Sequence, residues 1–61
     1  MNIAEQIRTR RNELEMTQLE LAFLVGCSQG RLSEWERGAT QPTLANLERL
    51  AAVLGSFTIG E

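Results

Sequence analysis

A connection of only three residues, Gly-Cys-Ser at 26–28, joins two segments that favour helix, and this limits how the chain can fold. Gly26 permits a left-handed backbone at the start of the connection. Ala22, four residues earlier, is small enough for two helices to approach closely there. Leu32 and Trp35 supply apolar anchors on the following segment. So short a connection turns two helices through a sharp angle instead of laying them side by side.

Capping residues and apolar spacing predict the boundaries of four helices. Ile3, Ile7 and Leu14 recur at helical spacing and predict a helix over residues 3–14. Thr17 and Glu20 form a capping box that opens a second helix. Ser28 and Thr43 are suited to cap the third and fourth helices, and glycines 26, 38 and 55 are suited to end the last three. The predicted inner positions are Leu21, Ala22 and Val25 on the second helix, and Leu44, Leu47, Leu50, Ala51 and Leu54 on the fourth.

Residues 56–59, Ser-Phe-Thr-Ile, depart from this helical pattern. They alternate polar and apolar side chains and favour an extended strand, with Phe57 and Ile59 on one face. A lone strand needs a partner for its backbone groups, and we expect the same strand from a second copy. The predicted fold is therefore a single all-α domain over residues 1–61, a compact four-helix unit with a short strand-like tail at 56–61.

Composition excludes several classes of function. The chain has one cysteine and no histidine, so it cannot form an internal disulfide and has no plausible zinc site. Without histidine or aspartate, the usual constellations for acid–base or nucleophilic catalysis are almost impossible to assemble. We expect no enzyme and no cofactor, and a small buried apolar role for Cys27. No apolar run approaches the ~20 residues of a membrane span, and a free thiol suits the cytoplasm. The net charge of −2 argues against strong non-specific binding to nucleic acid, but not against a local basic face.

The run "TQLELAFLVGCSQGRLSEWERGATQP", followed by "LANLERLAAVLG", resembles the Xre family of lambda-repressor-like helix-turn-helix DNA-binding domains. The likeness covers roughly residues 3–55, with the helix-turn-helix unit at about 17–37. The resemblance implies that the third helix enters the major groove of double-stranded DNA, usually in a homodimer on a palindromic operator. A fifth helix, common in the family, is missing here, which puts the family's usual dimer contact in question.

Outward positions on the third helix are the candidate base readers. Gln29, at the leading end, has the bidentate geometry that suits adenine. Arg31 can reach guanine or a phosphate, and Glu34 can accept from cytosine or pair with Arg31. We add Ser33 to the base-reading set. The candidate phosphate contacts are Gln18, Ser28, Gly30, Arg37, Thr40 and Gln41.

Three arginines of the first segment are open to more than one interpretation. Arg8 and Arg10 are either peripheral charge for DNA or solvated surface. The family resemblance implies that Arg11 pairs with the glutamate of "WERG", Glu36, to tie the first helix to the third. A DNA role for Arg11 is the alternative.

Leu19, Phe23 and Leu24 form an apolar surplus on the second helix that the fold does not explain. Such clusters mark interaction sites, and packing against the chain's own tail is the alternative. Two hypotheses of function follow. One is a sequence-specific DNA-binding regulator, a repressor acting as a homodimer. The other is an antitoxin-like module, similar to the HipB type, that holds a toxin or other protein partner and regulates its own operon.

Overall fold

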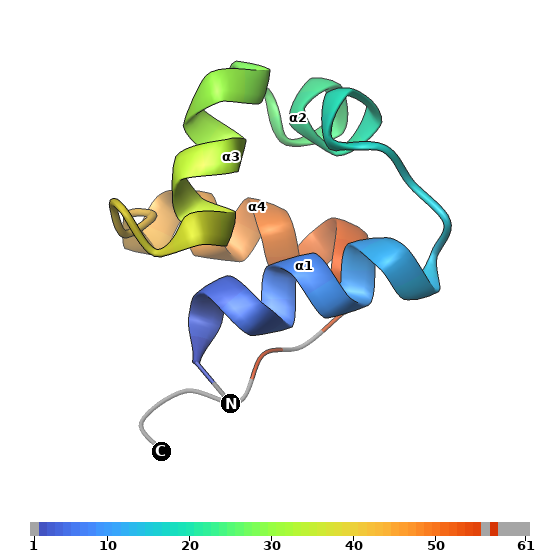
Figure 1. Cartoon of the computed structure of the whole chain (residues 1–61), viewed down its shortest axis with the longest axis horizontal. Coiled ribbons are helices and arrows are strands. Elements are labelled where there is room, and N and C mark those ends of the chain that lie inside the picture. Colours follow the sequence, from blue (N-terminus) through green and yellow to red (C-terminus); the bar gives the residue numbers. More distant parts are fainter. Residues whose placement is uncertain (1, 56, 58–61) are drawn as a thin grey trace.

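The computed structural model describes residues 2–55 and 57 of the 61-residue chain. It contains four α-helices, α1 (Ile3–Glu13), α2 (Gln18–Val25), α3 (Gln29–Arg37) and α4 (Leu44–Leu54) (Figure 1). No strand occurs among the described residues, and the predicted all-α fold is confirmed. Of the strand predicted at 56–59, only Phe57 falls within the described part, so the pairing of that strand lies outside it.

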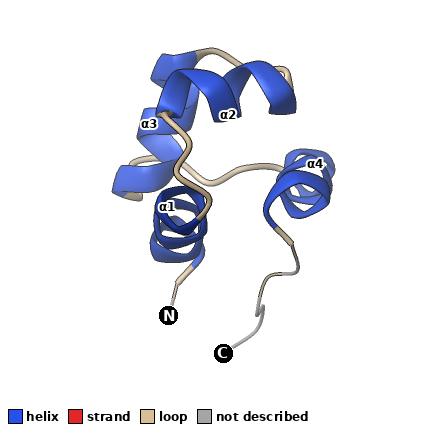
Figure 2. Cartoon of the chain, turned by 90° about the vertical axis from the view of Figure 1, so that its right-hand side faces the viewer, coloured by secondary structure: helices blue, strands red, loops and turns tan. Residues whose placement is uncertain are grey.

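The helices form two crossing layers. α1 and α4 both run horizontally in Figure 1 and are both seen nearly end-on in Figure 2, so they share a direction. Above them, α3 stands upright in Figure 1 while α2 points toward the viewer, which is the steep crossing that the three-residue connection predicts. α3 packs on both α1 and α2, and α4 packs on α1 and α2.

Each helix begins at a polar side chain that satisfies a free backbone N–H. Thr17 and Glu20 exchange both bonds of a capping box, with Thr17 Oγ1 accepting from Glu20 N at 3.0 Å and Glu20 Oε1 accepting from Thr17 N at 2.8 Å. Ser28, Thr43 and also Asn2 cap the other three helices. Gly26 ends α2 at φ 88°, a left-handed conformation that a residue with a Cβ adopts only under strain. The predicted caps at Thr17, Ser28 and Thr43 and the predicted stop at Gly26 are confirmed, whereas the Asn2 cap was not predicted and the first helix ends one residue earlier than predicted.

One apolar cluster holds the helices together. Its largest member is Trp35, 2% exposed, on the inner face of α3. The predicted inner residues of α2 and α3 are all buried there. The fully buried members are Ile7, Leu21, Ala22, Val25, Leu32, Trp35, Leu50 and Leu54.

Two residues of the predicted apolar faces, Leu14 and Leu44, are exposed, and the predicted inner residues Leu47 and Ala51 are only half-buried. Leu14 is 48% exposed, because α1 ends at Glu13 and Leu14 is already its C-cap. Leu44 is 71% exposed, because it is the first residue of α4 and lies at the end of the helix, beyond the cover of its neighbours. Helical periodicity identifies the face of a helix that points inward, but it does not say how far along that face other elements extend.

None of the described helices is long and apolar enough to cross a membrane. Within the described residues there is also no cluster of three or more metal-ligating side chains.

Candidate nucleic-acid interface

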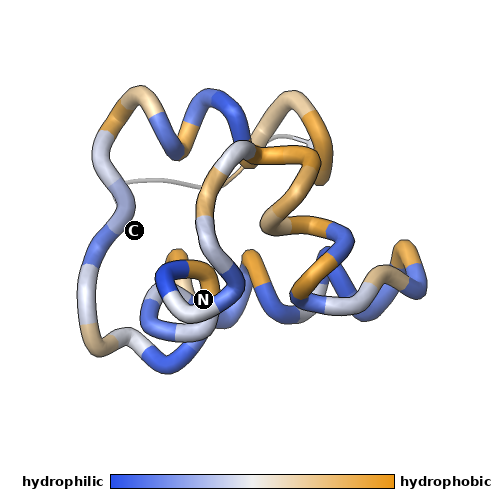
Figure 3. The backbone as a smooth tube through the Cα atoms, turned by 90° about the horizontal axis from the view of Figure 1, so that it is seen from above, coloured by the Kyte–Doolittle hydropathy of each residue, from blue (hydrophilic) through white to orange (hydrophobic). Residues whose placement is uncertain are grey.

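α3 shows opposite characters on its two sides. Leu32 and Trp35 are buried beneath it, whereas Gln29, Gly30 and Arg31 at its start are exposed. Further along, Ser33 and Glu34 are half-buried, and Arg37 at the end is exposed. The trace of α3 is largely hydrophilic in Figure 3, in contrast to α2. The predicted base readers therefore share one short helix whose packing leaves its polar side uncovered.

The polar side chains of α3 make only long, weak contacts with one another and with Thr40. Arg31 Nε lies 3.8 Å from Glu34 Oε1, and Thr40 Oγ1 donates to the same oxygen at 3.5 Å. Arg37 Nε donates to Ser33 Oγ at 3.4 Å. These are exposed and weakly constrained contacts, of the kind that contributes ~0–1 kcal/mol. The side chains can therefore exchange these partners for a ligand at little cost.

A buried carboxylate fixes the inner side of the same helix. Glu36 is 3% exposed, and its two oxygens accept from Arg11 Nε at 2.7 Å and Arg11 Nη2 at 3.0 Å. Arg11 Nη1 also donates to the Met16 carbonyl at 2.8 Å. The Arg11–Glu36 pair implied by the family resemblance thus forms in the structure, in the bidentate geometry that gives strong, oriented bonds. It anchors α3 to α1.

Gln18 opens α2 beside this pair. Its Nε2 donates to Glu36 Oε1 at 3.1 Å, so in the structure the amide of this candidate phosphate contact binds the buried carboxylate. Gln18 stays half-buried at the helix start, where free N–H groups favour an anion. The other predicted phosphate contacts are all exposed on α3 or at its two ends: Ser28, Gly30, Arg37, Thr40 and Gln41. Ser28 Oγ is engaged as the cap, accepting from Arg31 N at 3.0 Å.

Arg8 and Arg10 have structural roles that the sequence did not predict. Arg8 Nη1 donates to the Glu36 carbonyl at 2.7 Å, near the end of α3. Arg10 Nε and Nη2 donate to the Leu54 carbonyl at 3.0 and 2.8 Å, at the end of α4. A cation at the C-terminus of a helix satisfies free carbonyls and complements the helix dipole. Neither contact could be found from sequence, since the partners are 28 and 44 positions apart.

The apolar surplus of α2 remains uncovered in the described structure. Leu19, Phe23 and Leu24 are 62%, 82% and 54% exposed. Phe57 is half-buried and packs against the main core. The described residue of the tail therefore does not cover these side chains, and Ile59 lies outside the described residues.

Cys27, in the turn between α2 and α3, is partly buried and packs against the main core, which agrees with the small apolar role expected from the sequence, although its burial is incomplete. Burial raises the pKa of the Cys27 thiol, and the Arg31 guanidinium opposes that rise. The thiol therefore stays protonated at neutral pH, which fits a packing role.

Two short helices crossing at a tight glycine turn, with the second polar outside and anchored inside, define a helix-turn-helix domain. The family model for this domain, HTH_3 (helix-turn-helix), matches residues 7–61. The chain belongs to this helix-turn-helix family.

Several characterised proteins are similar. The HTH-type transcriptional regulator DicA of Escherichia coli (strain K12) is 44% identical over 54 residues, which are 88% of this chain and 40% of DicA. The P22 c2 repressor solved with a synthetic operator superposes with a TM-score of 0.84 at 39% identity, covering 88% of this chain and 82% of that one. SinR, a master regulator for biofilm formation solved with DNA, gives 0.81 at 32% identity, covering 90% and 92%.

The chain spans less than half the length of two of the curated relatives it matches, 40% of DicA and 24% of the Salmonella phage P22 repressor protein C2.

Proposed function

We propose that this protein is a sequence-specific DNA-binding transcriptional regulator that represses by occupying its operator. The observation that carries this proposal is the exposed polar side of α3, set on a helix held rigidly from behind by Trp35 and the Arg11–Glu36 pair. The similar proteins support it, because two of the solved structures are complexes with DNA. The proposed activity needs no cofactor and no catalytic group.

In the proposed complex, α3 lies in the major groove and reads base edges from its leading end. Gln29 is the first residue of the helix and reads adenine through its amide. Arg31 reads guanine, and Glu34 and Ser33 read the bases one turn further on. Gly30, with nothing within 4 Å of an added Cβ, lets the backbone approach the DNA closely.

Phosphate contacts flank this reading surface in the proposal. Gln18 and Ser28 lie at the starts of α2 and α3, where backbone N–H groups favour an anion. Arg37 ends α3, Thr40 and Gln41 follow it, and all three are exposed, so in this proposal they reach the opposite wall of the groove. These contacts position the domain and carry no sequence information.

We propose that two copies bind a palindromic operator. The two copies pair through residues 56–59 as an antiparallel ribbon, because a two-fold axis makes such a pairing self-complementary. The ribbon sets the two copies of α3 one helical turn of DNA apart, about 34 Å.

The test begins with selection of bound fragments from random DNA, followed by titration of variants on the selected site. Gln29→Ala should lose about 1–3 kcal/mol on the best site and relax one base position. Arg37→Ala should weaken every sequence alike and flatten the salt dependence. Asn12→Ala, an exposed amide on α1, is the matched control and should bind as the unaltered chain does. Recovery of no consensus, or equal binding by all three variants, would overturn the DNA-reading role.

A second candidate function is an antitoxin-like module that neutralises a partner toxin and controls its own operon. The observation in its favour is the exposed apolar side of α2, which DNA binding does not use. A toxin-like gene beside this one, and a stable complex of the two products, would distinguish this candidate from a stand-alone repressor.

A further inference from the structure

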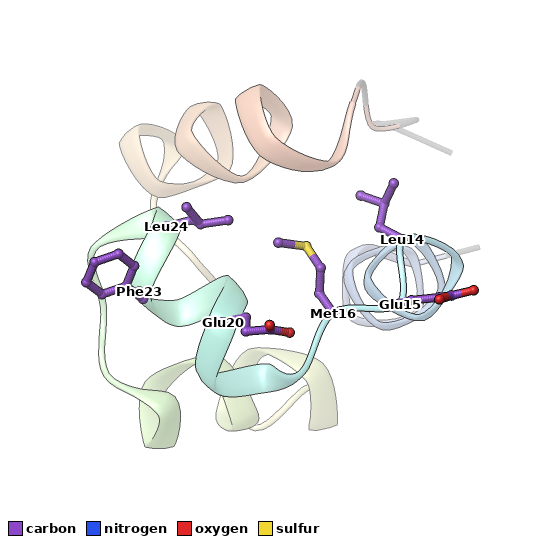
Figure 4. A pocket seen from close by; sticks show the side chains of 6 residues that line it. All are labelled: Leu14, Glu15, Met16, Glu20, Phe23 and Leu24. Carbon is purple, nitrogen blue, oxygen red and sulfur yellow. The ribbon is translucent and has the colours of Figure 1, made fainter.

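A hollow of about 400 Å³ opens between α2 and the end of α1 (Figure 4). In Figure 4, Leu14, Met16 and Leu24 point toward its centre, while Phe23 stands at the outer edge. The hollow is lined by Leu14, Glu15, Met16, Glu20, Phe23 and Leu24. We call it the α2 hollow.

The fold does not need most of these apolar side chains. Met16 is partly buried and packs against the main core, whereas Phe23, Leu24 and Leu14 are 82%, 54% and 48% exposed. Scattered exposed leucines are ordinary, but apolar side chains gathered around one concave surface are typical of a docking site.

The charge of the α2 hollow is wholly negative. Glu15 and Glu20 line it, and the lining includes no arginine. Arg11 of α1, which donates to the carbonyl of the lining residue Met16, is already bound to Glu36. A cation that approaches the α2 hollow therefore meets Glu20, whose Oε1 accepts from Thr17 N, and at the rim Glu15, whose side chain points away from the centre in Figure 4. No basic residue is among the lining residues to neutralise these two carboxylates.

These features select among occupants. DNA is excluded because its phosphates would face the two carboxylates. A second copy joined across a two-fold axis would bring the same acidic lining toward itself, and like charges at an interface are unfavourable. The described tail residue, Phe57, is already packed on the core. A basic and amphipathic partner satisfies both the apolar lining and the carboxylates.

We infer that the α2 hollow docks an amphipathic helical segment of another protein, with a leucine-type side chain inserted beside Phe23 and arginine or lysine residues facing Glu15 and Glu20. Such helix-in-groove recognition places its anchors at helical spacing. No residue of α3 lines the α2 hollow. The partner and the proposed DNA site can therefore be occupied together, and the inference does not depend on DNA binding.

The test uses the full chain without DNA and a fluorescent amphipathic peptide of leucine and arginine. Two comparison peptides carry glutamate in place of arginine, or alanine in place of leucine. Amide shifts in the NMR spectrum should be confined to the α2 hollow, and Phe23→Ser should weaken binding about tenfold, the size of an interface anchor. Glu15→Gln with Glu20→Gln should weaken it several-fold, and glutamine at 20 keeps the capping box. Leu44→Ser, an exposed leucine outside the α2 hollow, should change nothing.

Several outcomes would overturn the inference. Equal binding of the glutamate peptide would remove the charge argument, and equal binding of the alanine peptide would reduce the contact to non-specific charge attraction. Shifts centred on α3 would move the site elsewhere. If the unaltered chain is a dimer and Phe23→Ser makes it a monomer, the occupant is a second copy. Circular dichroism of each variant checks that the fold is retained, as expected for substitutions at exposed positions.

Discussion

Glu36 is 3% exposed, and side chains from two other helices, in place of solvent, bind its carboxylate. Arg11 of α1 binds both of its oxygens, and Gln18 of α2 donates to one of them. The backbone carbonyl of the same residue accepts from Arg8. A buried pair of this kind contributes little net stability compared with apolar packing, but the loss of one partner leaves an uncompensated charge. The residue therefore specifies where α3 sits more than it stabilises the fold.

This leads to a prediction for the pair. Arg11→Met should cost about 3–5 kcal/mol of unfolding free energy, because Glu36 then stays buried without its cation. The double variant Arg11→Met with Glu36→Leu should recover much of that loss, since no charge is left to bury. Urea denaturation measures both. The control is Glu13→Gln in the exposed Arg10–Glu13 pair, expected to cost ~0–1 kcal/mol. A double variant as unstable as Arg11→Met would contradict the explanation.

Among the helices, two glycines of the helix-turn-helix unit have different effects on stability. Gly26 is required for its left-handed backbone, whereas Gly30 lowers the stability of the helix that contains it. Gly26 has φ 88° and an uncrowded Cβ position, so its requirement is conformational and not steric. Gly30 lies inside α3 with nothing within 4 Å of an added Cβ. Glycine in a helix interior is less stable than alanine by up to ~1 kcal/mol. The fold alone gives no reason for glycine at position 30.

The two glycines should therefore respond oppositely to alanine. Gly26→Ala should destabilise the domain by roughly 1 kcal/mol, because alanine is strained at this φ. Gly30→Ala should raise stability by up to about 1 kcal/mol and weaken binding to the selected DNA site, if the backbone approaches the DNA there. Thermal unfolding and DNA titration of the same two proteins measure this. A Gly30→Ala protein that gains both stability and affinity would contradict a close approach at Gly30.

For the molecule as a whole, the small size of the chain means that its stability depends on one apolar core. A chain of 61 residues has an expected unfolding free energy of roughly 3–9 kcal/mol. Trp35 is the largest side chain in that core, and it belongs to the helix whose outer side is proposed to read DNA. Removing it empties a large volume that the short helices cannot close.

Trp35→Ala is accordingly expected to cost about 3–5 kcal/mol and to leave most molecules unfolded at moderate temperature. Leu44→Ala, at a leucine 71% exposed, should change the stability by less than ~0.5 kcal/mol. The ratio of the two effects is read from denaturation followed by circular dichroism. A Trp35→Ala protein that unfolds cooperatively with near-normal stability would show that the core is centred elsewhere.

Assembly gives a further prediction at this scale. Deletion of residues 58–61 keeps Phe57 and its core contact but removes most of the proposed ribbon. The shortened chain should be a folded monomer that binds the operator weakly, because each copy then holds the DNA alone. Sedimentation beside the full chain decides the matter. A dimer that survives the deletion would place the contact on another surface.

Patterns of neighbouring residues predicted most of the fold, whereas contacts between residues far apart in the sequence could not be predicted. The caps at Thr17 and Ser28 and the left-handed Gly26 follow from a few neighbouring residues, and all three are found in the structure. The exposure of Leu14 and the use of Arg10 to cap α4 depend on how helices distant in sequence end beside each other. The candidate base readers could be named because α3 has one unambiguous apolar side. Which bases they contact is not encoded in the spacing.

The division of α3 into an anchored side and an open side also bears on how such a protein can diverge. Leu32, Trp35 and Glu36 carry the packing, whereas Gln29 and Arg31 carry none of it. Substitutions at these exposed positions should therefore have little effect on folding. New side chains can arise there during evolution without compensating changes in the core. Recognition can drift from one target to another while the scaffold stays under purifying selection. After gene duplication, the two copies are expected to diverge first at these few outward positions.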